Sequence, residues 1–292
     1  MSETTDQNLS GVAETLLIPL YNRAMESLRP DAVLKDEKAV ELVRQMRLDF
    51  SRTKQVRMTE LLEALRIMFT REFDRFARDF LARHPDAVVV HIGCGLDTRF
   101  ERVDDDRVEW YDLDLPEVVD LRRKLIGGES GRYHLLGCSV FEEAWMESVK
   151  AQAPRPVLFL AETVFLYFAE AQVKSLVLAL RGRFPGAELV FDAWKPFEIR
   201  LGNRYLAHSA FAGLMRWGLW SGRQIEGWGD GIRLLDEWCF FDRPEPRLHT
   251  YRWMAPLFRL FKPMRILHFR LGSAGGGPRV SPRGTSQTNA PG

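Results

Sequence analysis

The sequence predicts an α/β protein, a doubly wound and mostly parallel sheet with an N-terminal helical cap and a helical lid insertion. From residue 87 onward, short apolar runs alternate with helical patterns, which is the order that parallel strands require. A glycine turn follows the first of these runs. The 292 residues are 46% hydrophobic and 28% charged, which is enough for one large core, so we expect a single domain over residues 11–271.

Residues 11–84 are expected to form the cap. Leu16–Phe50 has a helical pattern with a break at Pro30 and Asp31, and Thr59–His84 carries apolar residues at the spacing of a long amphipathic helix. Pro85 follows and ends that helix.

Residues 87–191 are expected to form the ligand-binding core. Its predicted strands are Ala87–Ile92, Val108–Asp112, Arg132–Leu136, Pro156–Leu160 and Ala187–Phe191. Residues 192–271 are expected to form a lid and two late strands that could pair, Ile232–Phe241 and Met264–Leu271. The polar residues 1–10 and the Gly-, Ser- and Pro-rich residues 272–292 are expected to be disordered.

Composition argues against several classes of partner. The formal net charge of +1 offers no broad basic field, so neither nucleic acid nor a membrane is expected as a partner. The three cysteines have neither metal-type nor disulfide-type spacing, and the first residues are unlike a signal peptide. We expect a cytoplasmic protein without a metal site, and the sequence leaves the oligomeric state open.

The glycine turn is a candidate nucleotide cradle. Gly93 and Gly95 flank Cys94 directly after an apolar strand, and residues without a Cβ let a ligand approach the backbone closely. Position 98 is Thr, where the dinucleotide-binding fingerprint has its third glycine. The turn alone therefore allows either a hydride donor or a methyl donor.

Polar residues at other strand ends point to the same cleft. Asp112 and Asp114 come about 20 residues after the glycine turn, where a carboxylate can hold ribose hydroxyls, although either could also cap the next helix. Ser139 and Val140 follow the third strand and could hold an adenine. Glu162 ends a strongly apolar strand, so it needs a partner, and a cationic ligand would be one.

Taken together, five motifs resemble one family. They are HIGCGLDTRFERV, VEWYDLDLPEVVDLRRK, CSVFEEAW, LFLAETVFLYF and RFPGAELVFD, in family order and spacing. The sequence resembles class I S-adenosylmethionine-dependent methyltransferases, and within them the leucine carboxyl methyltransferase superfamily with its tetracenomycin-type polyketide O-methyltransferases. The likeness covers nearly all of residues 15–271.

The resemblance implies a Rossmann-like fold with S-adenosyl-L-methionine as cofactor. The glycine turn would approach the methionine part, with Asp97 and Arg99 as a structural pair behind it. The implied cofactor contacts are Gly93, Cys94 and Gly95 in the turn, Asp112 or Asp114 at the ribose, Ser139 and Val140 at the adenine, Glu162 at the amino acid portion, and Asn22 or Arg23 in the cap.

The sequence departs from the family pattern at two positions. An arginine expected five residues before Asp74, reaching the cofactor carboxylate, is Phe69, so Arg66 or Arg71 would have to replace it. The family's Ala-Glu-Gly run ends in Thr163 instead of Gly. A lost charge-assisted contact is worth roughly 1.5–3 kcal/mol, so weaker cofactor binding is expected, not inactivity.

The acceptor is less clearly indicated. A phenol must lose its proton, whereas a carboxylic acid is already ionised at neutral pH. His208 is the best candidate base among the histidines, and Tyr167 and Tyr205 are candidates for orienting an acceptor. The absence of a clear base motif leans toward a carboxylate. Six of the eight tryptophans lie in the last third, which favours an apolar, polyketide-like small molecule, although a protein C-terminus remains an alternative.

Two other functions share parts of this pattern. A nicotinamide-dependent Rossmann oxidoreductase would use the same glycine turn and ribose acid, but the sequence lacks a Tyr-x-x-x-Lys hydride-site pair. A non-catalytic binding protein of the methyltransferase fold is suggested by Phe69 and Thr163.

Overall fold

The structure is a computed structural model that describes residues 11–46, 60–152, 154–205, 207, 212–243 and 245–272. Among the helices it describes, none is long and apolar enough to cross a membrane. The expectations of disorder for 1–10 and for the tail after Gly272 lie outside the described residues.

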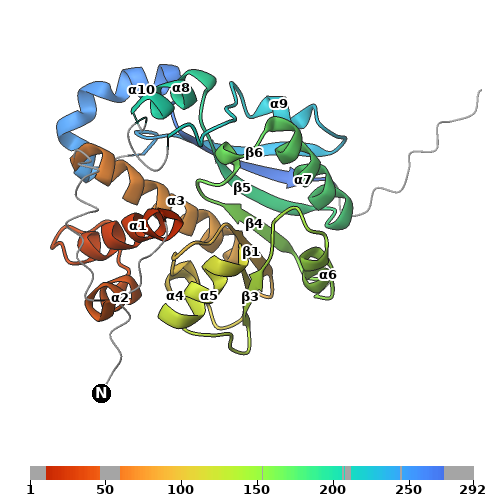
Figure 1. The fold of residues 1–292 in the computed structure, drawn as a ribbon. Coiled ribbons are helices and arrows are strands. Elements are labelled where there is room, and N and C mark those ends of the chain that lie inside the picture. Colours follow the sequence, from red (N-terminus) through yellow and green to blue (C-terminus); the bar gives the residue numbers. More distant parts are fainter. Residues whose placement is uncertain are drawn as a thin grey trace, which may run out of the picture.

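A seven-stranded sheet forms the centre of the molecule, in the order β3-β2-β1-β4-β5-β7-β6 (Figure 1). The first five strands pair in parallel, and β7 pairs antiparallel with both β5 and β6. The strands are β1 (Val88–Ile92), β2 (Glu109–Asp114), β3 (Tyr133–Gly137), β4 (Val157–Ala161), β5 (Ala187–Ala193), β6 (Ile232–Trp238) and β7 (Arg265–Leu271). All seven lie where the apolar runs predict them, and the predicted fold class is confirmed.

The two faces of the sheet carry separate cores. In β1, Val88, Val90 and Ile92 belong to one core cluster and Val89 belongs to the other, as the alternation of a strand requires. Helices α6 (Ala144–Lys150) and α7 (Glu170–Arg183) cover the first face, and α3 (Glu60–Arg83) covers the second. Because both faces are covered, the ligand site of such a sheet lies at the carboxyl ends of its parallel strands.

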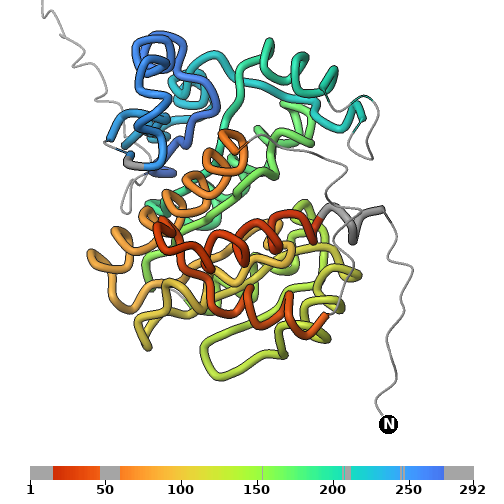
Figure 2. The backbone as a smooth tube through the Cα atoms, turned by 90° about the vertical axis from the view of Figure 1, so that its left-hand side faces the viewer, coloured from red at the N-terminus to blue at the C-terminus, as the bar shows by residue number. Residues whose placement is uncertain are grey.

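The cap consists of α1 (Gly11–Ser27) and α2 (Glu37–Met46), followed by α3. The predicted break at Pro30 is present as a turn between α1 and α2. Figure 2 shows α1 and α2 against the lower half of the molecule, with α3 running beneath the upper half. Short helices α4 (Arg99–Val103) and α5 (Pro116–Leu125) follow β1 and β2. The cap packs on the glycine turn, since Leu96 lies in one apolar cluster with α1 and α2.

The lid follows β5. It contains α8 (Pro196–Tyr205), α9 (Arg223–Glu226), the 3₁₀ segment η3 (Pro246–Met254) and α10 (Ala255–Phe261). In Figure 1, α8 and α10 lie side by side at the top of the molecule. A 3₁₀ turn, η2 (Phe165–Tyr167), follows β4 beneath them. The lid and η2 therefore stand over the carboxyl ends of β4 and β5.

Candidate functional site

The glycine turn after β1 has the conformation that requires glycine. Gly93 has φ +65° and Gly95 has φ +51°, both in the left-handed region. A Cβ on Gly93 would lie 2.4 Å from Val164 Cγ2, and one on Gly95 would lie 3.1 Å from Leu16 Cδ2. Cys94 between them is buried. The turn is therefore closely packed between the end of β4 and the cap.

The backbone N–H groups of this turn already have partners. Gly93 donates to the carbonyl of Leu113 at 2.7 Å, and Gly95 donates to Oδ2 of Asp114 at 2.7 Å. Both N–H groups are therefore occupied within the protein, and close approach of a ligand to this turn stays a prediction. The glycines shape the turn through their φ angles and missing side chains, and the Asp114 carboxylate lies beside it.

Asp114 stands at the end of β2, half-buried beside the glycine turn. Its Oδ1 accepts from the Leu115 N–H at 2.8 Å, and each carboxylate oxygen keeps a further lone pair for a ligand. Burial raises the pKa of this carboxyl, opposed by the hydrogen bonds from Gly95 and Leu115. A carboxylate at this strand end can accept from ribose hydroxyls.

Asp112, two residues earlier, has a different environment. Its carboxylate is buried, pairs with the Arg122 guanidinium and accepts from the Tyr133 hydroxyl at 2.7 Å and from Trp110 Nε1 at 2.8 Å. Burial acts against its charge, but Arg122 holds its pKa below the ordinary value. The geometry gives Asp112 an internal structural role and does not support it as a ribose ligand.

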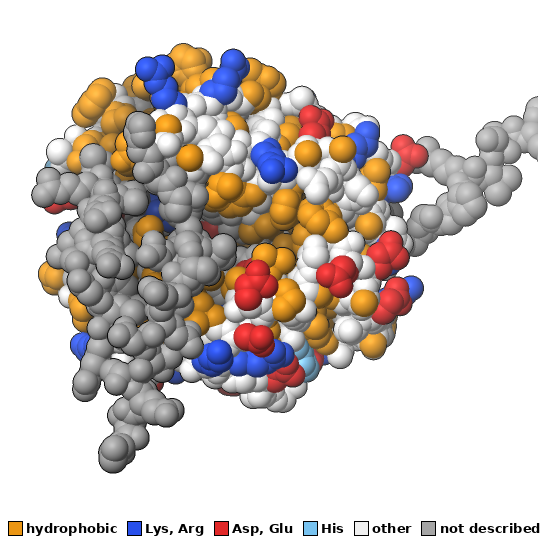
Figure 3. Space-filling model, in the orientation of Figure 1, with side chains coloured by type: hydrophobic (Ala, Val, Ile, Leu, Met, Phe, Trp, Pro, Cys, Tyr) orange, Lys and Arg blue, Asp and Glu red, His pale blue; other side chains and the backbone are white. Residues whose placement is uncertain are grey.

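Ser139 and Val140 follow β3 and lie beside Asp114, because Cys138 N–H donates to the Asp114 carbonyl at 2.9 Å. Ser139 Oγ accepts from the Phe141 N–H at 3.3 Å, and Val140 is packed in the core. Phe141 is exposed and meets the Phe168 ring edge-on at 4.8 Å. Aliphatic and aromatic side chains thus lie next to Asp114. Figure 3 shows a band of hydrophobic side chains across the middle of this face.

The two cap residues behave differently. Arg23 is buried and fastens the cap to the turn, donating to Asp36 Oδ2 at 2.8 Å and to the Leu96 carbonyl at 2.7 Å. Asn22 is half-buried, and its Nδ2 is buried without a hydrogen-bond partner among the described residues. Arg23 therefore holds the cap in place, while Asn22 retains a donor for a ligand.

Arg99 joins three elements in the interior. It is fully buried, donates from Nε to Asp74 Oδ1 at 2.8 Å, lies 3.0 Å from an oxygen of Asp97, and pairs with the carboxylate of Glu162. Burial opposes its charge, but these carboxylates together raise its pKa. Thr70 in α3 also donates to Glu162, at 2.8 Å. Glu162 has internal partners and keeps 18% side-chain exposure toward the site.

Four ionisable side chains gather where η2 meets the ends of β4 and β5. Tyr167 and Glu162 both lie within electrostatic range of Arg66. The Arg66 side chain is accessible to solvent, but partial desolvation of its guanidinium lowers its pKa. Asp192 lies within range of Glu162 and Tyr167. Burial raises the pKa of Tyr167, and the charge of Asp192 raises it further.

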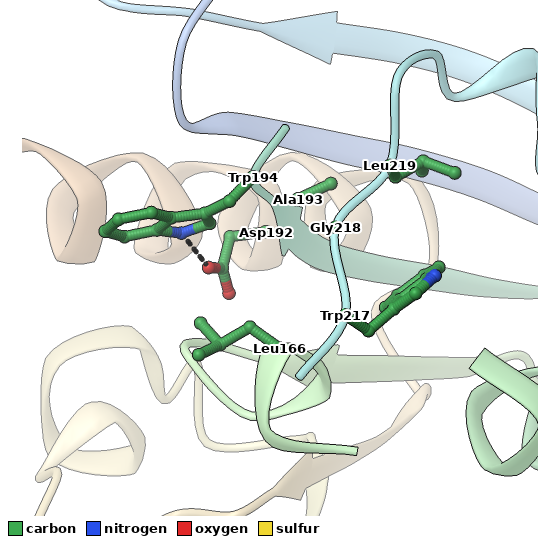
Figure 4. A pocket seen from close by; sticks show the side chains of 7 residues that line it. All are labelled: Leu166, Asp192, Ala193, Trp194, Trp217, Gly218 and Leu219. Atoms are coloured by element: carbon green, nitrogen blue, oxygen red, sulfur yellow. Dashed lines mark hydrogen bonds between the residues drawn. The ribbon is translucent and has the colours of Figure 1, made fainter. Parts of the chain in front are cut away.

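Asp192 is a residue that the sequence reasoning missed. It ends the apolar strand β5 and is buried, with Oδ1 accepting from the Thr163 N–H and Oδ2 from Trp194 Nε1 at 2.9 Å (Figure 4). Burial raises the pKa of Asp192 to about 7. A carboxylate directly after an apolar run was the signal that identified Glu162, and the same signal was present here.

A narrow pocket adjoins Asp192. Figure 4 shows Leu166 on one side and the chain from Trp217 to Leu219 on the other, with Trp194 above. Trp194 and Trp217, two of the tryptophans expected to line an acceptor site, border this space, which is too narrow in this structure to admit a water molecule. The candidate base His208 lies outside the described residues. Tyr205, at the end of α8, is exposed on the lid.

The structure accounts for Phe69, one of the two departures from the family pattern, and has no explanation for Thr163, the other. Phe69 is buried, stacked on Phe240 at 5.1 Å and edge-on to Trp238 at 5.8 Å, so it belongs to the core. Arg71 pairs with Glu245 instead of facing the site. Thr163 is exposed and has φ +58°, a conformation that strongly favours glycine.

These residues fit a nucleoside cofactor with an amino acid portion. The glycine turn has no room for a side chain at Gly93. The Asp114 carboxylate offers hydrogen-bond acceptors, and the buried Asn22 Nδ2 offers a donor that has no partner among the described residues. Arg66, in the second turn of α3, and Glu162, directly after β4, carry side chains of opposite charge.

Comparisons with known proteins identify the family. Residues 17–180 match the family described as Leucine carboxyl methyltransferase. The tetracenomycin polyketide synthesis O-methyltransferase TcmP of Streptomyces glaucescens is 34% identical over 271 residues, covering 92% of this chain and 97% of that protein. The S-adenosyl-L-methionine-dependent methyltransferase dpfgK of Gibberella zeae is 29% identical over 265 residues, covering 85% and 88%.

Solved structures support the fold. A putative methyltransferase from Thermobifida fusca superposes with a TM-score of 0.54 at 16% identity, covering 87% of this chain and 94% of that one. A DUF574 family protein from Streptomyces avermitilis gives 0.55 at 15% identity, covering 88% and 96%. The family decides against the nicotinamide alternative. The chain belongs to the leucine carboxyl methyltransferase family and is an S-adenosyl-L-methionine-dependent O-methyltransferase.

Proposed function

We propose that this enzyme methylates a carboxylate or phenolic hydroxyl of a small, aromatic or polyketide-like molecule. The observation that carries the proposal is the grouping of Asp114, Arg66 and Glu162 along one sheet edge, beside the lid residues Trp194 and Trp217. The likeness to TcmP, whose name assigns it to polyketide synthesis, supports an acceptor of this class.

The cofactor supplies an electrophilic methyl group on a sulfonium, and the protein has to hold it in line with an acceptor oxygen. Asp114 binds the ribose, Ser139 and Val140 flank the adenine, and Asn22 donates from the cap. Arg66 binds the carboxylate of the amino acid portion, in place of the arginine that Phe69 replaces. The apolar lid excludes water from the acceptor.

Asp192 is the proton acceptor available to a phenol. Its pKa of about 7 is matched to proton transfer near neutral pH, and Tyr167, within electrostatic range of Asp192, would orient the acceptor. The phenolate oxygen formed in this way would be the nucleophile for the methyl group that the bound cofactor would supply. An acceptor carboxylate is already ionised and needs no such proton transfer.

Calorimetry tests the cofactor site. We expect binding of S-adenosylhomocysteine to weaken at least tenfold in Asp114→Ala, through loss of hydrogen bonds to a charged group. Arg66→Ala should weaken it about ten- to a hundredfold but leave 5′-methylthioadenosine unaffected, because that compound lacks the amino acid portion. Arg71→Ala is the matched control and should bind both like the wild type. Equal affinity of Arg66→Ala and wild type for S-adenosylhomocysteine would remove Arg66 from the site.

Transfer of a labelled methyl group to a panel of aromatic acids and phenols tests the acceptor class. We expect Asp192→Asn to lose transfer to phenols and to retain transfer to carboxylates. If the wild type binds S-adenosylhomocysteine but methylates no member of the panel, the small-molecule acceptor is wrong and a protein C-terminus takes its place.

A further inference from the structure

The outer surface of the lid exposes an unusual number of large apolar side chains. Trp253 is 75% exposed, Leu260 76% and Leu201 65%. The exposed apolar residues of α8, of segment 212–220 and of η3 with α10 together form what we call the lid surface: Phe197, Leu201, Tyr205, Leu214, Trp220, Trp253, Leu257, Leu260 and Phe261. Contiguous apolar surface of this kind marks an interaction site.

Two hydrogen bonds and a ring contact join the three parts into one surface. Asn203 in α8 donates to the Met215 carbonyl at 2.8 Å, and the Phe197 and Trp220 rings lie 6.3 Å apart. Lys195, directly before α8, donates to the carbonyl of Phe261 at the end of α10. On α10, Leu257, Leu260 and Phe261 are spaced three and four residues apart, so they share one helix face.

The charged residues of the lid surface all have one sign. Exposed arginines lie among the apolar residues, and none of them makes an ion pair with another residue that the structure describes; they are Arg200, Arg204, Arg216, Arg252 and Arg259. The acidic residues of these elements, Glu198 and Glu245, are buried. In Figure 3 the top of the molecule, over α8 and α10, shows orange and blue side chains together.

We propose that the lid surface docks on a membrane that contains anionic lipids. Tryptophan and tyrosine settle at the level of lipid headgroups, leucine and phenylalanine insert just below it, and arginines are attracted to anionic headgroups. A second copy of this chain is a poorer occupant, because a twofold contact would set this cationic surface against itself. Docking holds the lid in a layer where apolar molecules dissolve.

Sedimentation with vesicles tests the proposal. Vesicles of phosphatidylcholine with about one third phosphatidylglycerol should bind the full-length chain, whereas phosphatidylcholine alone should bind it about tenfold or more weakly. Raising the salt concentration should release the protein from anionic vesicles, since the Debye length falls to about 3 Å at 1 M.

Variants locate the surface. Trp253→Glu with Leu260→Glu should reduce vesicle binding at least about tenfold, because each charge would have to enter the apolar layer. Arg200→Ala with Arg204→Ala should reduce binding to anionic vesicles only. Leu28→Glu, at a cap residue that is 54% exposed, is the matched control and should bind like the wild type. All these positions are exposed, and melting curves verify folding.

Three results would overturn the proposal. The first is absence of wild-type binding to anionic vesicles, and the second is binding that neither pair of substitutions alters. The third is a wild-type dimer in light scattering that becomes a monomer in the Trp253→Glu, Leu260→Glu double variant while vesicle binding stays unchanged. That result would make the lid surface an interface between two copies of the chain. Binding of S-adenosylhomocysteine is independent of each of these results, so the cofactor site is judged separately.

Discussion

The backbone N–H of Thr163 donates to Oδ1 of Asp192, joining the segment that follows β4 to the end of β5. This contact holds Thr163 at φ +58°, where a β-branched residue is strained. The neighbouring carboxylate is buried and its pKa is about 7. Backbone strain and a buried acid therefore meet at the point where the lid covers the sheet edge.

Thr163→Gly should stabilise the protein. Glycine adopts this φ without the roughly 1–2 kcal/mol that an L-residue loses there, and an exposed threonine gives up little packing. Glycine also raises the conformational entropy of the unfolded chain, which offsets part of this gain. We therefore expect the free energy of unfolding, measured in urea, to increase by about 1 kcal/mol. Thr163→Ala keeps the Cβ and should gain much less. Equal stability of the two variants would show that φ is not strained.

Asp192→Asn should change how stability depends on pH. The pKa of Asp192 in the folded chain, about 7, lies above its ordinary value of 3.8, so the folded state binds the extra proton between these values. The stabilisation is complete below pH 3.8 and is lost as the pH rises through about 7. Three pKa units correspond to about 4 kcal/mol. The wild type should lose this amount relative to Asp192→Asn between pH 4 and 8, measured by urea unfolding. Parallel curves for the two proteins would contradict the assignment.

Asp112→Asn and Asp114→Asn should separate stability from binding. The first leaves Arg122 buried beside a neutral partner and should lower the free energy of unfolding by about 3 kcal/mol or more. The second retains an oxygen for the Gly95 N–H and should change stability little, but it should weaken S-adenosylhomocysteine binding about tenfold. Chemical unfolding and calorimetry on the same samples measure both effects, and a reversed pattern would exchange the two roles.

Gly93→Ala should destabilise the protein by about 2 kcal/mol, because its Cβ would lie 2.4 Å from Val164 Cγ2 and its φ of +65° is unfavourable for alanine. Adding Val164→Ala should recover the steric part only. Thermal unfolding of the single and double variants measures this recovery. If the double variant were no more stable than Gly93→Ala, the contact would not be the cause.

Phe69→Arg restores the residue type that the family pattern has at this position, yet it should not tighten cofactor binding. The side chain is enclosed by Trp238 and Phe240, so a charge there would be buried without a partner. We expect a loss of about 3 kcal/mol or more in the free energy of unfolding. A folded variant with higher affinity for S-adenosylhomocysteine would show that the guanidinium can reach the site.

The sequence was sufficient to predict the strands of the sheet and the order of helices and strands along the chain. Buried parallel strands are continuous apolar runs, so β1 and β4 could be located to within a residue. The predicted end of β2 differs from the observed one by two residues, and this difference changes which aspartate lies at the sheet edge. The strand was predicted to end at Asp112, but it continues to Asp114, which puts the second carboxylate at the sheet edge and leaves the first inside.

Contacts between residues far apart in the chain could not be predicted in the same way. From the sequence, Arg66 and Arg71 were equal candidates to replace the family arginine that is Phe69 here. In the structure Arg71 pairs with Glu245, which lies 174 positions away in the sequence. Arg66 shares a face of α3 with Thr70, and Thr70 contacts Glu162. The raised pKa of Asp192 could not be predicted from the sequence either, because it depends on burial beneath the lid.

The net charge of +1 led to the expectation that no membrane would be a partner. A sum over the chain says nothing about where charges lie, and in the folded protein Glu198 and Glu245 are buried while Arg200 and Arg204 stay exposed. The sequence by itself determined the fold class, the family and the cofactor, because these depend on local apolar periodicity and short motifs. The tertiary structure decided which of two aspartates stands at the sheet edge and which is buried against Arg122, which arginine pairs with Glu245 and which charges remain at the surface, because burial and pairing arise only when distant segments pack together.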